Sequence, residues 1–563
     1  MKNLIRFIAI MICGNLLAQS KTIVVGDIEE FENAVENVSP GSTIKLKNGI
    51  WEDVELAFYA DGSEGDSITL TAETPGEVIL TGSSKLRIAG EYLIIKNLDF
   101  SGGQSDGDAI ISFRRSSSDV ANHSRVTNCR IINYNPSSDE TEYKWVSLYG
   151  EHNRVDHCNF EGKNNEGALL VVWLSGSANN HRIDHNYFAN IPELGRNGGE
   201  TIRIGTSTNS MTESRTIVEH NLFESCDGEI EIISNKSGFN IFRYNTFLDS
   251  EGTLTLRHGN DCEVYGNFFI GGNKDSGGVR IIGERHKVYN NYFEGLDGDG
   301  FRAALSITNG VPDSPLNRYF QVKDAEVVHN TFVACKEPIA IGAGKSSELS
   351  LPPINSVIAN NVIDKTTGSR AFTYDDDPEG FTYSSNYVNG NIGVSENGIA
   401  NLNPELTQSF GIWRLSESSP MIDISSTSFE YVTEDIDGHD RGDDPDAGSD
   451  EYSTSSPINI PLSKDDAGFQ WEIDTTALAT SIHKSECGIV LTNDRLKIIG
   501  IDGRHYPLRI VLYNLNGSTL LDKFSSTDSL ELDRIGDRVL IVRLLDKTGQ
   551  PFFYGKTIVW RLK

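Results

Sequence analysis

The chain has 563 residues, of which 49 are Lys or Arg and 80 are Asp or Glu, so its formal net charge is −31. This acidic surplus favours solubility and argues against nucleic acid and anionic membrane surfaces as partners, since both are negatively charged. With 53 Gly and only 17 Pro, the composition suits many tight turns and few helices, in one long solenoid or more than one domain.

The first twenty residues have the three parts of a secretory signal peptide. Lys2 and Arg6 supply the charged start, residues 7–17 the apolar core, and residues 18–20 the small side chains near a cleavage site. A buried N-terminal strand or helix is the alternative. We expect residues 1–20 to be removed and the protein to be secreted, periplasmic or on the cell surface. No later stretch approaches the ~20 apolar residues of a membrane span.

From residue 21 the chain is predicted to form a solenoid. A helix over residues 29–37 and a strand at 43–46 indicate a capping segment. A short phrase then recurs, with an apolar residue, Asn or Cys three positions later, and a second apolar residue two positions after that. The Asn or Cys of each copy stands at 129, 158, 186, 221, 245, 267, 291, 330 and 361.

The shortest intervals between these copies, 22 and 24 residues, lie in the range of solenoid repeats. The pattern predicts an all-β, right-handed parallel β-helix over residues 21–452, with coils about 4.8 Å apart and inward Val, Ile and Phe stacked in one core. Asn at a fixed turn position can adopt left-handed geometry and bond to its neighbours above and below. Cys129 and Cys158 occupy this position, so we expect stacked core thiols, with a disulfide as the alternative.

Within the solenoid, the segment from Asn197 to Arg302 carries a series of charged residues. Glu229 and Glu231 are two apart on a predicted strand, so their side chains leave the same face. Two carboxylates held together repel each other unless a cation joins them. With the amide oxygen of Asn197 they make an all-oxygen set, which suits Ca²⁺ rather than zinc. The alternative is a solvated pair of glutamates at an edge.

Basic residues continue this series at intervals of about one coil. Lys236, Arg257, Arg280 and Arg302 are separated by 21, 23 and 22 positions and are predicted to form a cationic column on one face. In an acidic polysaccharide, the proton next to a uronate carboxylate becomes removable once that carboxylate is neutralised. Lys236 could take this proton if neighbouring cations favour its neutral form. Arg257 hardly deprotonates, so it could stabilise the leaving oxygen while water or His258 supplies the proton.

The solenoid is predicted to end near residue 452, and residues 453–456 are predicted to be a linker. Residues 457–563 have alternating apolar runs, two of them separated by an Asn-Gly turn, which is typical of a hairpin. We expect a small C-terminal β-sandwich there.

At these residues the chain resembles polysaccharide lyase family 6, which contains alginate lyases and chondroitinase B. The matching elements are NGGETIRIG from residue 197, GEIEIISNKS from 228 and TLTLRHG from 253, with supporting phrases FEGKNNEG from 160, GGVRIIG from 277 and RYFQV from 318. The resemblance covers about residues 22–450. The C-terminal part is similar to the sorting domains of Bacteroidetes-type secretion systems.

The resemblance implies a right-handed parallel β-helix and a set of site residues. It implies that Lys236 is the base, that Arg257 is the acid, and that Asn197, Glu229 and Glu231 are Ca²⁺ ligands. The remaining candidates, which would contact substrate, are Lys163, His258, Arg280 and Arg302.

The implied activity is β-elimination in an anionic polysaccharide. Alginate is the favoured substrate and dermatan sulfate is the alternative. A hydrolase would need paired carboxylic acids without a metal, and Asp227 with Glu229 is a poor pair. A non-catalytic glycan-binding adhesin would not need the spacing of Lys236 and Arg257. The sequence does not decide the oligomeric state or the block preference.

Overall fold

The structure is a computed structural model that describes residues 21–471, except 273 and 369, and the strands between residues 488 and 558. The predicted signal peptide, residues 1–20, lies outside the described residues. Helix α1 (Ile28–Glu36) follows strand β1 (Thr22–Val25) and begins at Asp27, whose side chain accepts the backbone N–H of Glu30. Phe31 and Ala34 are buried on its inner face, so α1 caps the first coil as predicted.

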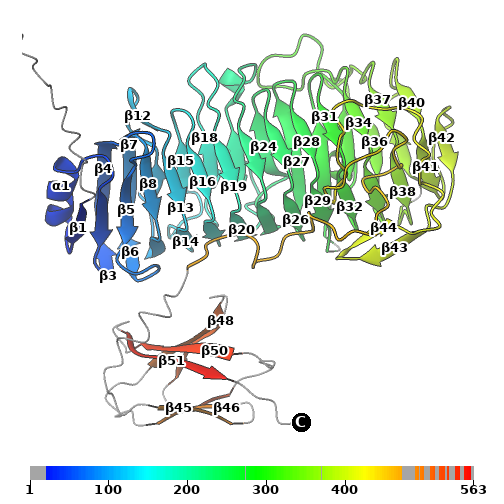
Figure 1. The fold of residues 1–563 in the computed structure, drawn as a ribbon. Coiled ribbons are helices and arrows are strands. Elements are labelled where there is room, and N and C mark those ends of the chain that lie inside the picture. The colour runs from blue at the N-terminus through cyan, green and yellow to red at the C-terminus, as the bar shows by residue number, and fades with distance from the viewer. Residues whose placement is uncertain are drawn as a thin grey trace, which may run out of the picture.

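Three long parallel sheets wrap around a single core (Figure 1). The first sheet runs from β1 to β40 (Thr382–Ser384), and the third runs from β3 (Gly49–Glu52) to β42 (Ile399–Asn401). The second sheet carries the predicted site. Its strands are β4 (Glu55–Asp61), β7 (Lys85–Glu91), β10 (Ile111–Ser112), β11 (Arg114–Ser116), β12 (Asp119–Asn122), β15 (Val146–Leu148), β18 (Leu170–Val172), β21 (Ile202–Ile204), β24 (Glu231–Lys236), β27 (Gly252–His258), β30 (Ser276–Ile281), β33 (Leu305–Thr308), β36 (Ile339–Ala343) and β39 (Phe372–Tyr374). The prediction of a parallel β-helix is confirmed.

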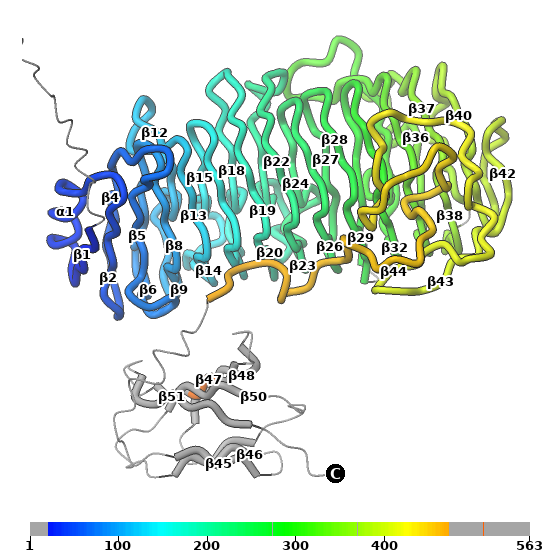
Figure 2. The backbone as a smooth tube through the Cα atoms, viewed as in Figure 1, coloured from blue at the N-terminus to red at the C-terminus, as the bar shows by residue number. Residues whose placement is uncertain are grey.

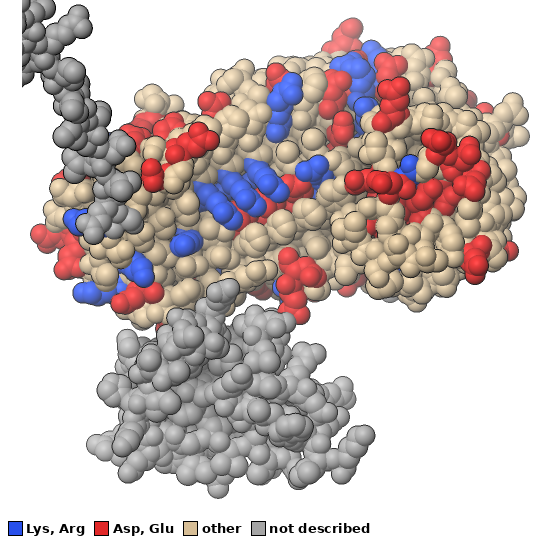
Figure 3. All heavy atoms as spheres, viewed as in Figure 1, with Lys and Arg blue, Asp and Glu red and all other residues tan. Residues whose placement is uncertain are grey.

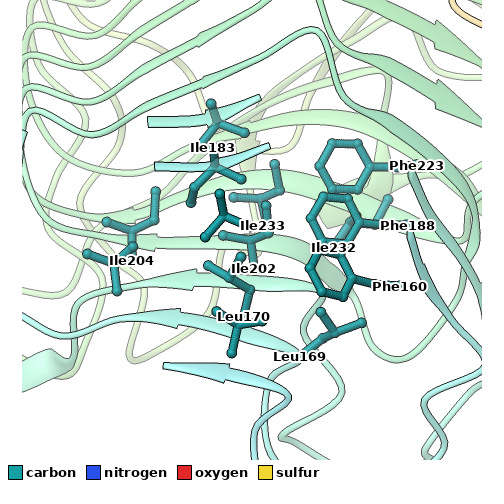
Figure 4. Close-up of a cluster of buried hydrophobic side chains, with 14 of the residues drawn as sticks. Phe160, Leu169, Leu170, Ile183, Phe188, Ile202, Ile204, Phe223, Ile232 and Ile233 are labelled. Carbon is teal, nitrogen blue, oxygen red and sulfur yellow. The ribbon is translucent and has the colours of Figure 1, made fainter. Parts of the chain in front are cut away.

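The core is built from identical side-chain types stacked coil on coil. Phe160, Phe188 and Phe223 lie face to face, with ring centroids 5.2 and 5.0 Å apart, and Leu170, Ile202 and Ile233 fill the same layer from the second sheet (Figure 4). Each such buried side chain contributes about 1.5–3 kcal/mol to stability relative to an exposed one. The predicted inward stacking is confirmed.

An asparagine ladder runs beside this core. Asn221 accepts the backbone N–H of Asn186 and donates to the side-chain oxygen of Asn245 at 3.0 Å, and the pattern repeats along the helix. The left-handed residue is the one before each ladder position, such as His185 with φ of 54° and His220 with φ of 52°. The predicted geometry is therefore wrong by one residue, because the bend turns the ladder side chain inward. The ladder consists of Asn186, Asn221, Asn245, Asn267, Asn291, Asn330, Asn361 and Asn386.

Cys129 and Cys158 continue the ladder toward the N-terminus. Both thiols are free and buried, and the backbone N–H of Cys158 donates to Asn186 Oδ1 at 3.0 Å. The prediction of stacked core thiols is confirmed.

A ladder of ion pairs lies on the outside of the first sheet. Strands β13 (Arg125–Thr127), β16 (Arg154–Asp156) and β19 (Arg182–Asp184) align their arginines. Each arginine binds a carboxylate of the next coil, as in Arg125 Nε to Asp156 Oδ1 at 2.6 Å. Figure 3 shows a row of basic side chains interleaved with acidic ones over this part of the fold.

After the last coil, the chain turns back along the outside of the helix (Figure 2). It forms the hairpin β43 (Leu406–Ser409) and β44 (Ile412–Leu415), and residues 457–471 then cross strands of the third sheet. Leu462 and Ala467 pack there on Tyr187 and Leu222. We call residues 457–471 the return segment.

Beyond the return segment the described strands pair antiparallel. One sheet holds β45 (Gly488–Thr492), β46 (Arg495–Ile499) and β49 (Ser529–Glu531); the other holds β48 (Thr519–Ser525), β47 (Leu508–Tyr513), β50 (Val539–Leu545) and β51 (Pro551–Ile558). Pairing of β47 with β48 confirms the predicted hairpin. The domain boundary at residue 457 stays a prediction. No helix in the described part of the chain has the length and apolar run that crossing a bilayer requires.

Candidate active site

Lys236 and Arg257 lie at the ends of two neighbouring strands of the second sheet. Lys236 ends β24 and is paired with His258 in β27, whereas Asn235 is paired with Leu256. The ladder thus skips Arg257, and this bulge places the guanidinium beside the lysine coil. Bulges commonly re-aim side chains at functional sites. The two side chains are 18% and 15% exposed, so both are largely buried.

Three glutamates gather next to these cations. Glu231 begins β24, Glu229 precedes it by two residues, and Glu200 lies one coil earlier, since Thr201 donates to the carbonyl of Ile232. Glu229 accepts the backbone N–H of Gly198 at 3.0 Å. Burial, followed by the charges of Glu200 and Glu231, raises the pKa of Glu229 to about 8.

Glu200 is a site residue that the sequence analysis missed. Its carboxylate lies 3.7 Å from Lys236 Nζ, and its other oxygen is buried without a hydrogen-bond partner among the described residues. Its signal was present in the sequence: Glu200 closes the same Asn-Gly-Gly-Glu motif that supplied Asn197.

Two arginines converge on Glu231. Arg257 Nε lies 3.6 Å from Glu231 Oε1, and Arg280, whose side chain is 2% exposed, binds the same oxygen, while Ser234 binds the other. Two guanidinium groups on one buried carboxylate offset the cost of burying all three charges.

The predicted cationic column is wrong in its register. Arg280 is paired with Thr255 rather than with Arg257, and Arg302 lies in the short helix η2 (Gly300–Arg302) instead of a strand. A bulge after Asn235 skips Arg257 between β24 and β27, and another after Gly252 shifts β30 against β27, so equal spacing along the sequence does not give stacking in space.

Aromatic rings hold the two arginines in place. The Tyr319 ring lies 4.1 Å from Arg257 Cζ, and the Phe301 ring lies 5.2 Å from Arg280 Cζ. The rings meet edge to face, with centroids 6.0 Å apart. Burial lowers the pKa of Arg257. Tyr319 was part of a matched phrase but received no role from the sequence.

The other predicted site residues lie at varied depths. Lys163 is 3% exposed, its ammonium donates to the carbonyl of Asn165, and burial lowers its pKa to about 7. His258 is buried, and burial, with the charges of Arg257 and Lys236, lowers its pKa to about 3, so its ring is neutral at neutral pH. Asn197 is exposed on the loop before Glu200. Substrate contact by Lys163, His258, Arg280 and Arg302 stays a prediction.

The three glutamates are the ligand type of a hard cation, but their ligand atoms do not all lie within 4.8 Å of one another, and Arg280 and Ser234 bind the two oxygens of Glu231. Glu200, Glu229 and Glu231 offer carboxylate oxygens only, which is the chemistry that Ca²⁺ prefers. Burial, and after it the charges of Glu200 and Glu231, raise the pKa of Glu229, so a positive charge nearby would favour its ionised form.

A second acidic group lies far along the chain. Among the described residues, only Asp435, Asp437 and His439 bring three His, Cys, Asp or Glu ligand atoms within 4.8 Å of one another. Asp437 binds Arg414 through both oxygens, at 2.6 and 2.8 Å, and Asp435 accepts the backbone N–H of His439. These carboxylates already have partners in the fold.

Comparison with known proteins agrees with the fold. A family model described as Chondroitinase B matches residues 25–427. A solved structure described as the PL6 family alginate lyase AlyGC is 39% identical with a TM-score of 0.71, and the match covers 80% of this chain and 59% of AlyGC. The chain therefore spans less than two thirds of the length of AlyGC. No curated protein sequence matches the chain.

Two further solved structures are similar. A mannuronic acid specific polysaccharide family 6 lyase from human gut microbiota is 33% identical with a TM-score of 0.59, covering 65% of this chain and 86% of that one. The PL6 family polysaccharide lyase Pedsa3628 from Pseudopedobacter saltans is 27% identical with a TM-score of 0.59, covering 80% and 100%.

Proposed function

This chain belongs to the chondroitinase B family, polysaccharide lyase family 6, and we propose that it cleaves alginate, a uronate polymer, by β-elimination to unsaturated oligosaccharides. The observation that carries the proposal is the pair of cations, Lys236 and Arg257, at the ends of adjacent strands above three clustered glutamates. The predicted secretory signal is consistent with a polymer that is met outside the cytoplasm.

In the proposed reaction, Lys236 is the base and Arg257 faces the leaving group. The neutral amine of Lys236 accepts the proton on C5 of the uronate, the electron pair forms the C4–C5 double bond, and the C4–O bond breaks. Arg257, held by Glu231 and Tyr319, donates a hydrogen bond to the departing oxygen, whose proton comes from Arg257 or from water.

We propose that Asn197, Glu229 and Glu231 hold Ca²⁺, with Glu200 as an added ligand. Bound there, the ion would neutralise the uronate carboxylate and stabilise the negative charge that develops on it. Chelation is expected to lower the rate, and added Ca²⁺ to restore it; an unchanged rate after chelation would remove the metal from the proposal.

The ultraviolet absorbance of the new double bond tests the reaction on poly-mannuronate, poly-guluronate and dermatan sulfate in parallel. Lys236→Ala is expected to lose about 10²–10⁴-fold in kcat, while Lys323→Ala, a lysine paired with Glu284 on the surface, keeps the wild-type rate. Normal turnover by the Lys236→Ala variant would refute the assignment of Lys236 as the base. Reducing ends without absorbance would indicate a hydrolase, and binding without any product would indicate an adhesin.

Dermatan sulfate is the second candidate substrate because the matching family model is described as Chondroitinase B. Alginate ranks first because the two solved structures with 39% and 33% identity are described as an alginate lyase and a mannuronic acid specific lyase. Absorbance with dermatan sulfate and none with either uronate polymer would reverse this order.

A further inference from the structure

An outward row on the second sheet continues from Lys236 toward the N-terminal coils. Strands β15, β18 and β21 align Leu148 with Val172 and Val172 with Ile204, and Ile204 is paired with Asn235. The residues that follow these positions are Tyr149, Trp173, Gly205 and Lys236. At about 4.8 Å per coil, Trp173 stands about 10 Å from Lys236, on the same surface.

Two aromatic rings occupy the far end of this row. Tyr149 and Trp173 are stacked with centroids 5.9 Å apart and planes within 6°, and the indole N–H of Trp173 donates to Ser147 Oγ at 3.2 Å. Unlike the phenylalanines of the core, both are only partly buried. The hydrogen bond and the stacking fix the rings, so a ligand would meet a preformed surface.

Arginines cover both rings and have no carboxylate partner. Arg114 Cζ lies 4.0 Å from the Tyr149 ring and Arg203 Cζ lies 5.5 Å from the Trp173 ring. No described carboxylate lies within 4.0 Å of either guanidinium, and Arg203 Nε is buried with no described hydrogen-bond partner. In contrast, the arginines on the first sheet are all paired. In a chain of net charge −31, unpaired arginines are available to an anionic ligand.

Gly205 leaves the step between Trp173 and Lys236 without a side chain. Its φ is +83°, and a Cβ there would lie 2.7 Å from the carbonyl oxygen of Lys236 and 2.9 Å from Leu174 Cδ1. Only glycine fits such a position. The row therefore presents rings, then an open step, then the amine.

We infer that Arg114 and Arg203, held in place by Tyr149 and Trp173, bind uronate units of the polymer on the N-terminal side of Lys236; the identity of the sugar acid rests on the proposed function. The rings stack on each other and lie under the two arginines, so they hold the guanidinium groups in place, and each guanidinium binds a uronate carboxylate through paired hydrogen bonds. The ligand class is a chain of acidic sugars, held while its next unit reaches Lys236.

Binding to an inactive protein tests this inference without turnover. In the Lys236→Ala background, Trp173→Ala is expected to weaken the affinity for poly-mannuronate by about 3- to 10-fold, measured by calorimetry. Trp173→Phe is expected to keep most of the affinity because it retains a ring. Phe410→Ala, which removes an aromatic side chain that is 60% exposed on β43–β44, serves as the matched control.

Kinetics of the single Trp173→Ala variant complete the test. KM for the polymer is expected to rise by the same factor with kcat nearly unchanged, because the lost contact is equal in ground and transition states. If the protein is an active lyase and the Trp173→Ala variant has the same KM and kcat as the Phe410→Ala variant, the inference is overturned and the proposed function stands. An absence of lyase activity, together with weaker poly-mannuronate binding by Trp173→Ala, would refute the proposed function and leave the binding surface standing.

Discussion

Arg257 is held by partners that come from different parts of the chain. Glu231 is one coil earlier, whereas Tyr319 comes from the insertion before β34 (Glu326–Val328). This insertion is tied down where Gly310 and Leu351 exchange backbone hydrogen bonds and where Gln321 donates to the carbonyl of Pro352. These contacts hold the guanidinium in one geometry, as the role proposed for Arg257 on the leaving oxygen requires.

Removing the Tyr319 ring is expected to disturb this geometry. Because a cation–π contact at a desolvated site contributes about 1–2 kcal/mol, Tyr319→Leu should lower kcat about 10-fold with little change in KM. Tyr319→Phe keeps the ring and should keep the rate. Steady-state kinetics on alginate check this, and equal losses in both variants would assign the effect to the hydroxyl group instead.

Within the coils, a second ladder of side chains closes the turn that precedes the first sheet. The backbone N–H of Asn153 donates to His181 Nδ1 at 3.1 Å, that of Thr216 to Asn240 Oδ1 at 2.8 Å, and that of Cys262 to His286 Nδ1 at 3.2 Å. Histidine and asparagine thus have the same structural role at this turn, which is to accept a backbone N–H of the previous coil. The histidines differ in one respect, since burial lowers the pKa of His181 to about 3 and that of His286 to about 4.

This difference predicts a pH dependence of the free energy of unfolding. Between pH 6.5 and about 4 the unfolded chain protonates His286 while the folded chain does not, so stability falls as the pH falls through this window. The full contribution is about 3 kcal/mol. His286→Asn should keep the hydrogen bond to Cys262 and flatten the slope, measured by denaturant unfolding at several pH values. A variant with the wild-type slope would contradict this account.

At the scale of the whole molecule, the return segment binds coils that are far apart in sequence. Leu462 N–H donates to Thr246 Oγ1 at 2.8 Å, Gly468 N–H to the carbonyl of His185 at 2.7 Å, and the Trp471 indole to the carbonyl of Asn128 at 2.8 Å. It runs on the third sheet, whereas the candidate site lies on the second. We therefore expect the return segment to affect the stability of the fold and not the rate of the reaction.

Two truncations separate these effects. A chain ending at residue 471 keeps the return segment, and one ending at 456 loses it. Because several hydrogen bonds of about 1 kcal/mol each are removed, the shorter chain is expected to melt about 5 °C lower, with an unchanged rate at low temperature. Equal melting temperatures, measured by calorimetry, would show that the segment contributes nothing.

The sequence by itself determined the coils, the stacked core, the ladder and the residues Glu229, Glu231, Lys236 and Arg257 as candidates. The coils, the core and the ladder follow from side chains that recur at one position per coil, because each coil buries its apolar residues against the next and local periodicity predicts long-range pairing. The four candidates follow from their spacing and from the family resemblance.

Only the tertiary structure decided the register and the partners. Two bulges move Arg257 out of the ladder and Arg280 away from it, and such shifts leave no trace in residue spacing. Glu200 and Tyr319 reach the site through backbone pairing and through a long insertion, which depend on the folded path of the chain. The return segment is similar, since its partners lie more than 200 residues earlier.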